Sequence, residues 1–117
     1  MLDYDGKRIQ LVCKQVDMRK SINGLSIYVQ MQLEQDPMGG MYVFCNRNRN
    51  RLKILEWDED GFWLYCKRLE KGRYSWPSEA EEEPVMELDA GEMRVLTSGT
   101  KLVQKFRRSH LSNMTVC

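Results

Sequence analysis

The chain has 117 residues, of which 42% are hydrophobic and 30% are charged. This composition suits one domain with a single core beneath an ionic surface. It contains no run of the about 20 apolar residues that a membrane-spanning helix needs. The first ten residues, MLDYDGKRIQ, include acidic side chains and no apolar segment, so they do not resemble a secretory signal peptide. We therefore expect a cytoplasmic protein.

The formal net charge of +1 hides a segregated distribution. Residues 1–78 carry an excess of three positive charges, and residues 79–93 hold seven acidic side chains and no basic one. Residues 94–117 hold five basic side chains and no acidic one. Nucleic-acid binding responds to the local potential, so the near-neutral total does not exclude it. The distribution does exclude a uniformly basic polymer binder.

The N-terminal third predicts a strand followed by a helix. Residues 8–14 alternate polar and apolar side chains, which is typical of a strand. A helix over about 22–35 follows, and its apolar stripe consists of Ile22, Leu25, Val29 and Leu33. Asp17 has the chemistry of a helix N-cap, although the helix could begin as late as Ser21.

A second set of apolar side chains lies on the other side of this helix. Ile27 and Met31 belong to it, which indicates either burial on two sides or a patch that faces a partner. The sequence DPMGG, residues 36–40, ends the helix, because proline and paired glycines cannot continue it.

The middle of the chain predicts an antiparallel meander. Residues 41–45 are apolar on both faces, as in a central strand. Further strands are predicted at 52–57, 62–69 and 73–76, the last one stopped by Pro77. The connecting turns are 47–51, 58–61 and 71–72. We expect Gly61 to supply the positive φ that a tight turn requires.

After an acidic loop at 78–84, order resumes at 85–88. Asp89 is placed to cap a short helix that carries Met93, Val95 and Leu96. The predicted fold is a single α+β domain over residues 1–98. It has a mostly antiparallel sheet of about five strands, one long helix after the first strand and a short C-terminal helix. Residues 99–117 form a basic tail, flexible or with a short helix.

The cysteines do not indicate a metal site. Cys13, Cys45, Cys66 and Cys117 are scattered without a close pair, and His110 is the only histidine. The first three lie in apolar runs, where we expect buried thiols. The sequence thus predicts neither a metal nor a cofactor.

Basic residues around the meander are the first candidate site, and they consist of Arg47, Arg49, Arg51, Lys53, Lys67, Arg68 and Arg73. The turn at 46–52 and the turn at 71–72 are expected at the same end of the sheet. Clustered guanidinium groups suit phosphate, and the neighbouring asparagines could bind sugar or base edges. The alternatives are an acidic protein partner or a merely solvated turn.

A second group, Asp17, Arg19 and Lys20, is expected to have a structural or contact role. Arg19 should pair with a carboxylate such as Asp17 or Asp58, or reach a partner. The aromatic side chains that alternate with the basic residues are predicted to be core, and they are Tyr42, Phe44, Trp57, Phe62, Trp63, Tyr65, Tyr74 and Trp76.

Catalysis has little support. A metal-dependent nuclease would need carboxylates such as Asp58, Glu59, Asp60 and Glu70 around a divalent ion, with Lys67 or Lys71 beside them. The first three fit a hairpin turn without further assumption, and the chain has no glycine-rich phosphate loop. The only histidine lies in the tail. We therefore predict that the chain is not an enzyme.

Two segments carry a resemblance to a known family. They are VDMRKSINGL (16–25) and MYVFCNRNRNRLKILEWDEDGFWLYCKRLEKGRYSWP (41–77). Over about residues 2–98 the chain resembles the Orf2-type (TnpB) accessory proteins of the insertion-sequence-66 family of bacterial transposable elements. The resemblance implies a non-catalytic helper in transposition that works beside a separate, larger transposase. It implies partners encoded by the same element, with or without direct contact to DNA.

Two functional hypotheses follow from the residues and the resemblance together. In the first, the accessory protein binds DNA phosphates through the basic turn and the adjacent end of the sheet. In the second, it is an adaptor whose arginines meet the transposase or a sister accessory protein without touching DNA. The tail departs from the family pattern after Gly99, and its basic residues Lys101, Lys105, Arg107 and Arg108 are a reserve candidate surface.

Overall fold

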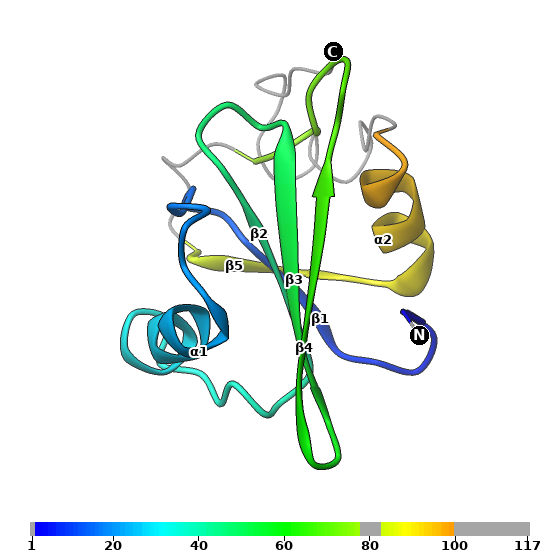
Figure 1. Ribbon diagram of the computed structural model, residues 1–117. Coiled ribbons are helices and arrows are strands. Elements are labelled where there is room, and N and C mark those ends of the chain that lie inside the picture. Colours follow the sequence, from blue (N-terminus) through cyan, green and yellow to red (C-terminus); the bar gives the residue numbers. More distant parts are fainter. Residues whose placement is uncertain (1, 78–82, 100–117) are drawn as a thin grey trace.

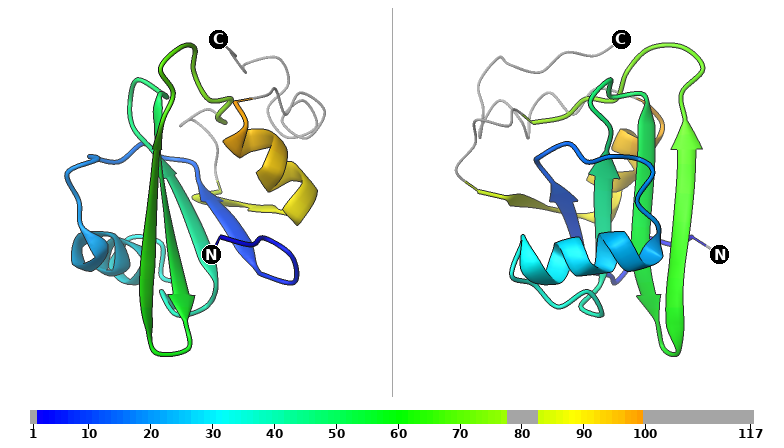
Figure 2. Two further views of the ribbon diagram at one scale, coloured as in Figure 1. Left: turned by 45° about the vertical axis from the view of Figure 1, so that its right-hand side comes forward. Right: turned by 60° about the vertical axis from the view of Figure 1, so that its left-hand side comes forward.

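The computed structural model describes residues 2–77 and 83–99, and it contains a five-stranded sheet with one helix on each face (Figures 1 and 2). The strands are β1 (Ile9–Val12), β2 (Met41–Cys45), β3 (Arg51–Asp58), β4 (Gly61–Arg68) and β5 (Val85–Leu88). The helices are α1 (Ile22–Met31) and α2 (Ala90–Thr97). The tail at 100–117, with its four basic residues, lies outside the described residues.

The strand order is β4-β3-β2-β1-β5. β1 and β2 are parallel, since α1 crosses over between them, and the other neighbouring pairs are antiparallel. β2 lies at the centre, and all five of its residues are buried, as its apolar sequence predicts. The predicted α+β class with a mostly antiparallel five-stranded sheet is confirmed.

The core has two layers, one on each face of the sheet. On one face, Leu25 and Val29 of α1 pack against Phe44 and Leu55. On the other face, Met93 and Leu96 of α2 pack in a cluster with the sheet residue Ile54. Strand residues alternate between these two clusters, as the pleat of a sheet requires.

The predicted strand at 73–76 is wrong. Residues 73–77 have no strand pairing, and the fifth strand is β5, which pairs with β1 at the opposite edge. Tyr74 and Trp76 are nevertheless fully buried in the α2-side core, where the Trp76 indole nitrogen donates to Val12 O at 3.0 Å. Alternation of side chains cannot distinguish a strand from an extended segment that lies across the core.

Helix α1 is shorter than the predicted helix. It begins after Ser21, the later of the two expected starts, and ends at Met31. Glu34 then adopts a left-handed φ of 53°, and the Gln35 amide donates back to Val29 O. Leu33 stays buried although it lies outside the helix, so the apolar stripe predicted the burial correctly but overestimated the length.

The sequence predicted the start of α2 better than the details of the β3–β4 turn. The β3–β4 turn lies at 58–61 as expected, but Glu59 (φ 49°) takes the positive φ that Gly61 was expected to supply. At α2 the prediction is confirmed. Asp89 accepts a hydrogen bond from the Glu92 amide, and the Glu92 side chain accepts one from the Asp89 amide.

Candidate phosphate or partner interface

A basic groove lies on the α1 face of the sheet, where β3 begins and β4 ends. Its larger hollow has a volume of about 450 Å³ and is lined by Met18, Arg51, Leu52, Lys53, Cys66, Lys67, Arg68 and Glu70. A second hollow of about 370 Å³ includes Met18, Arg47 and Arg51 in its lining. Because the two hollows share Met18 and Arg51, they are continuous. We call this continuous surface the basic groove, and its principal cations are Arg47, Arg51, Lys53 and Arg68. Lys67 also lines the larger hollow, but its ammonium donates to Thr97 O.

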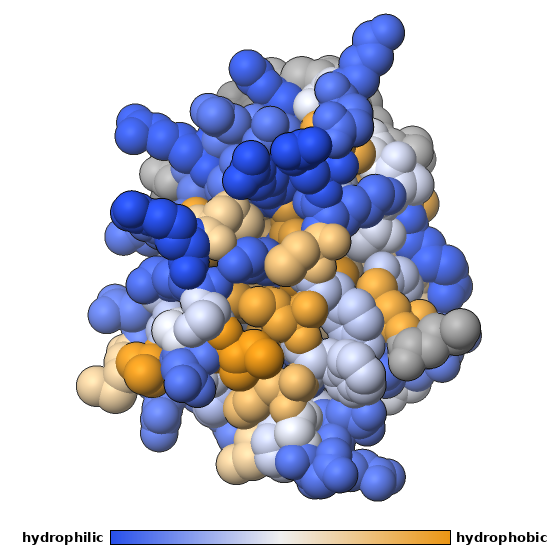
Figure 3. Space-filling view, in the orientation of Figure 1, coloured by the Kyte–Doolittle hydropathy of each residue, from blue (hydrophilic) through white to orange (hydrophobic). Residues whose placement is uncertain are grey.

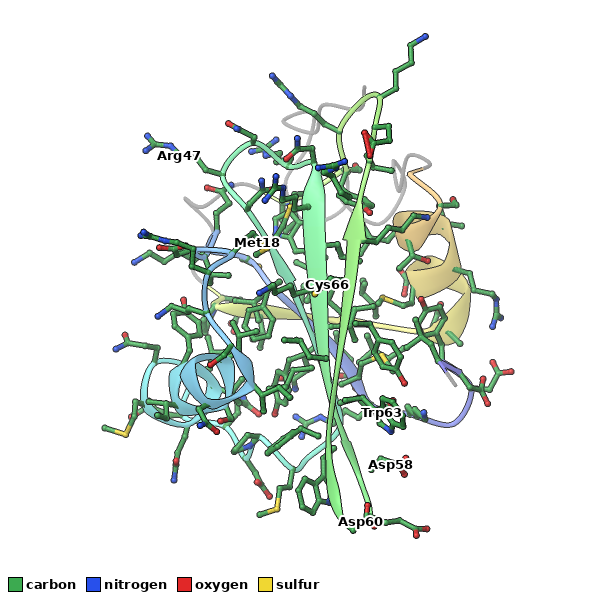
Figure 4. The ribbon with its side chains drawn as sticks, viewed as in Figure 1. Met18, Arg47, Asp58, Asp60, Trp63 and Cys66 are labelled. Carbon is green, nitrogen blue, oxygen red and sulfur yellow. The ribbon has the colours of Figure 1, made fainter. Side chains whose placement is uncertain are left out.

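The strand register brings these side chains together. In the β3–β4 ladder Arg51 lies opposite Arg68, and Lys53 lies opposite Cys66. All four positions have the same parity as Leu55 and Leu64, which pack on the α1 side, so they face the same way. Arg47 comes from the turn before β3 and extends outward from that end of the molecule, above Met18 and Cys66 (Figure 4).

The groove holds positive charge that is only partly neutralised. The Arg68 guanidinium pairs with Glu70 at 2.7 Å, and both side chains are largely exposed. Among the residues that the structure describes, Arg47 and Arg51 have no carboxylate within ion-pair distance. Like charges directly opposite each other on neighbouring strands destabilise a sheet. Arg51 opposite Arg68 is therefore an unfavourable cross-strand pair, which Glu70 offsets in part.

Asn46 and Asn50 hold the conformation of the turn through side-chain hydrogen bonds. The Asn46 side chain accepts from the Asn50 and Arg51 amides and donates to the Asn50 side-chain oxygen at 2.7 Å. Arg49 takes a left-handed φ of 59° in this turn. Asn50 is thus engaged inside the turn, and Asn48 remains the exposed asparagine between the arginines.

The structure separates the other predicted cations from the groove cations. The Lys67 ammonium donates to Thr97 O at 2.7 Å, at the end of α2 on the opposite face of the sheet. Arg49 is half-buried, and Arg73 is exposed on the loop after Gly72. That loop lies beside the 46–50 turn, as predicted, since the Tyr74 amide donates to Arg49 O at 2.6 Å.

The segment 17–20 forms a rim of the groove. Arg19 pairs with Asp17, the first of the partners expected from the sequence, and its Nη2 lies 2.7 Å from Asp17 Oδ2. Hydrogen bonds from Arg19 lower the pKa of Asp17 to about 2, so the carboxylate stays ionised over nearly the whole pH range. The Lys53 ammonium donates to Lys20 O at 2.8 Å and ties this rim to β3.

Sequence reasoning missed Met18 and Cys66 as parts of the groove. Met18 is half-buried and lines both hollows. The position of Met18 between Asp17 and the Arg19–Lys20 pair was visible in the sequence, but nothing local indicates that the segment folds over the start of β3. The one indication in the sequence was that Cys66 lies two residues before Arg68, so that both face the same side of a strand.

The carboxylates considered for a nuclease do not come together. Asp58, Glu59 and Asp60 lie at the tip of the β3–β4 hairpin, and Glu70 follows the other end of β4. An eight-residue strand extends about 25 Å, so this length separates them. No group of three or more potential metal ligands occurs within residues 2–77 and 83–99.

The buried-thiol prediction is correct for two cysteines and wrong for one. Cys13 and Cys45 are buried, and burial raises the pKa of the Cys45 thiol to about 12. Cys66 is exposed, because it lies on the edge strand and lines the groove. Cys117 lies outside the described residues.

We expect iodoacetamide to distinguish these thiols. In a Cys117→Ser background, the folded chain should be alkylated at Cys66, whereas Cys13 and Cys45 should react only after unfolding. Mass spectrometry of peptides before and after denaturation measures this order. Cys66→Ser is the control, and it should abolish alkylation of the folded chain. Reaction of Cys45 at the same rate as Cys66 would contradict the burial.

Two other expectations about apolar residues are corrected. Trp63 is not core, since 49% of it is exposed on the edge strand. On α1, Ile27 and Met31 are 57% and 68% exposed, so burial on two sides does not occur within the described chain. The partner-facing alternative for these two residues stays a prediction.

Comparison with known proteins decides the family. The family model described as "IS66 Orf2 like protein" matches residues 7–107. The chain belongs to the IS66 Orf2-like family. It is 32% identical over 93 residues to the uncharacterized protein y4hO of Sinorhizobium fredii, which covers 79% of each chain. It is 37% identical over 73 residues to y4jC of the same organism, 62% of each chain. No solved structure matches the chain.

Membership confirms the resemblance found in the sequence and suggests an accessory role in the transposition of IS66-type elements. The family is associated with the IS66 transposition machinery and is not known as a catalytic one. Neither α1 nor α2, the helices of the described part of the chain, is long and apolar enough to cross a membrane.

Proposed function

We propose that this transposition accessory protein binds DNA phosphates through the basic groove. The observation that carries the proposal is the placement of Arg51 directly opposite Arg68 at the groove. The two side chains repel each other in the isolated fold, and a phosphate between them would remove that cost. Arg47 and Lys53 extend the positive surface on either side.

The groove suits a polyanion better than a small ligand. Its hollows are continuous along the end of the sheet, and the exposed Arg47 lines the smaller one. Guanidinium groups bind phosphate oxygens in a bidentate manner, and contacts of this kind position a protein on DNA without reading its sequence. We therefore propose that contacts to the sugar–phosphate backbone of DNA dominate the binding and make it sensitive to salt.

The test is the salt dependence of binding to a duplex from an element end. Each phosphate contact contributes a slope of about −0.9 in the logarithm of affinity against the logarithm of salt concentration. Arg51→Ala with Arg68→Ala should therefore make the slope shallower by about 2. The fold should not be destabilised, since two opposed like charges are removed. Fluorescence anisotropy at several salt concentrations measures the slope.

The matched control removes two positive charges that line neither hollow, by Lys14→Ala with Arg94→Ala. This variant should keep the slope of the unaltered chain. Equal slopes for all three proteins would contradict phosphate binding in the groove. Weak DNA binding by every variant, together with loss of the transposase from a pull-down by the Arg51/Arg68 variant alone, would assign the groove to a protein partner instead.

A further inference from the structure

The sheet has one long open edge. β4 ends the strand order, and it has eight residues, whereas β5 at the opposite edge has four. An antiparallel ladder leaves the amide and carbonyl of every second β4 residue directed away from β3. Such an edge is a template for another strand unless charges, a proline or a bulge protect it.

The centre of this edge is not protected. Residues 62–66, FWLYC, contain neither a charge nor a proline. On one face the exposed Trp63 stacks on Tyr65, with ring centroids 6.0 Å apart. On the other face Phe62 and Leu64 are only half-buried beside the α1 cluster. Figure 3, in the orientation in which β4 lies in front, shows hydrophobic residues gathered at the centre of this side with hydrophilic residues above and below.

The two ends of the edge carry opposite charge. Glu59 and Asp60 are exposed at the hairpin tip before β4 (Figure 4 labels Asp60). Arg68 ends the strand and Lys71 follows it, both exposed, and Glu70 between them pairs with Arg68, so this end keeps a net positive charge. If a second β4 lies antiparallel to the first, each acidic tip lies beside the basic end of the other copy. A parallel arrangement would place like charges together, so the edge is complementary to itself in the antiparallel direction alone.

We propose that β4 pairs antiparallel with β4 of a second copy of this chain, giving a two-fold dimer with one continuous sheet. A register centred on Tyr65 sets Trp63 opposite the partner's Lys67 and Phe62 opposite the partner's Arg68. Each of these pairs is suited to a cation–π contact. The two-fold axis runs perpendicular to the sheet, so both basic grooves face the same side of the dimer.

Charge reversal at the two ends tests this geometry by sedimentation of the full chain. The tip-reversed variant carries Glu59→Lys and Asp60→Lys, and it leaves Asp58, which accepts from the Trp63 indole, unchanged. The end-reversed variant carries Arg68→Glu and Lys71→Glu. All four positions are exposed, so circular dichroism should show folded proteins. Lys14→Glu with Arg94→Glu is a control that reverses two exposed charges away from β4.

The unaltered chain and the control should sediment at twice the chain mass of 13.9 kDa. Each reversed variant alone should fall to the mass of one copy, because both ends of its dimer repel. An equimolar mixture of the two should return to twice the mass, since each reversed end then meets an opposite charge. The proposal is overturned if the unaltered chain sediments as one copy, if a reversed variant alone stays dimeric, or if the mixture does not recombine.

Discussion

Trp76→Ala should destabilise the fold by about 3–5 kcal/mol, a large share of the about 5–15 kcal/mol that stabilises a typical domain. Trp76 is fully buried in the cluster between the sheet and α2. Its indole nitrogen donates to Val12 O, which joins the segment after β4 to the strand β1. The substitution removes this hydrogen bond and leaves a cavity in the core. The midpoint of urea unfolding, followed by circular dichroism, measures the loss.

The matched control is Trp63→Ala, the same chemical change on the open edge. Trp63 is 49% exposed, and its contacts are the stacking on Tyr65 and one hydrogen bond to Asp58. We expect this variant to lose about 1 kcal/mol. Equal losses for the two tryptophans would mean that residues 73–77 do not hold the core together as the structure indicates.

Gly40→Ala should destabilise the chain by about 2–6 kcal/mol, because two separate costs add. Gly40 has a φ of +140°, and a side chain in such a conformation costs about 1–3 kcal/mol. An added Cβ would also lie 2.5 Å from the backbone oxygen of Arg8, which accepts from the Met41 amide where β1 and β2 begin to pair. Overpacking of this kind costs about another 1–3 kcal/mol.

Gly61→Ala is the control for this prediction. Gly61 has no positive φ, and an added Cβ would meet no atom within 4 Å. Its stability should change by less than about 1 kcal/mol, in either direction. Urea midpoints for the two variants give the comparison, and a Gly40→Ala protein as stable as Gly61→Ala would show that β1 and β2 can separate at this point without cost.

Several features of this protein follow from the sequence by itself, because they depend on neighbouring residues. The run Met41–Cys45 is apolar on both faces and forms the central strand. The acidic residues at 58–60 form the hairpin turn, and Asp89 with Glu92 starts α2 through a capping box. Family membership was also visible, since it rests on the order of residues along the chain.

Tertiary structure alone decided which of these elements meet. Residues 73–76 alternate like a strand, yet they pair with no strand and bury Tyr74 and Trp76 in the α2-side core, while the neighbouring β4 edge stays open. The basic residues looked like one group. Strand parity places Arg51 and Arg68 on the α1 face and sends Lys67 to the end of α2. Cys66 and Trp63 lie in an apolar run and are exposed, because β4 is the edge. Burial and charge neighbours depend on pairings between distant segments, which local periodicity does not encode.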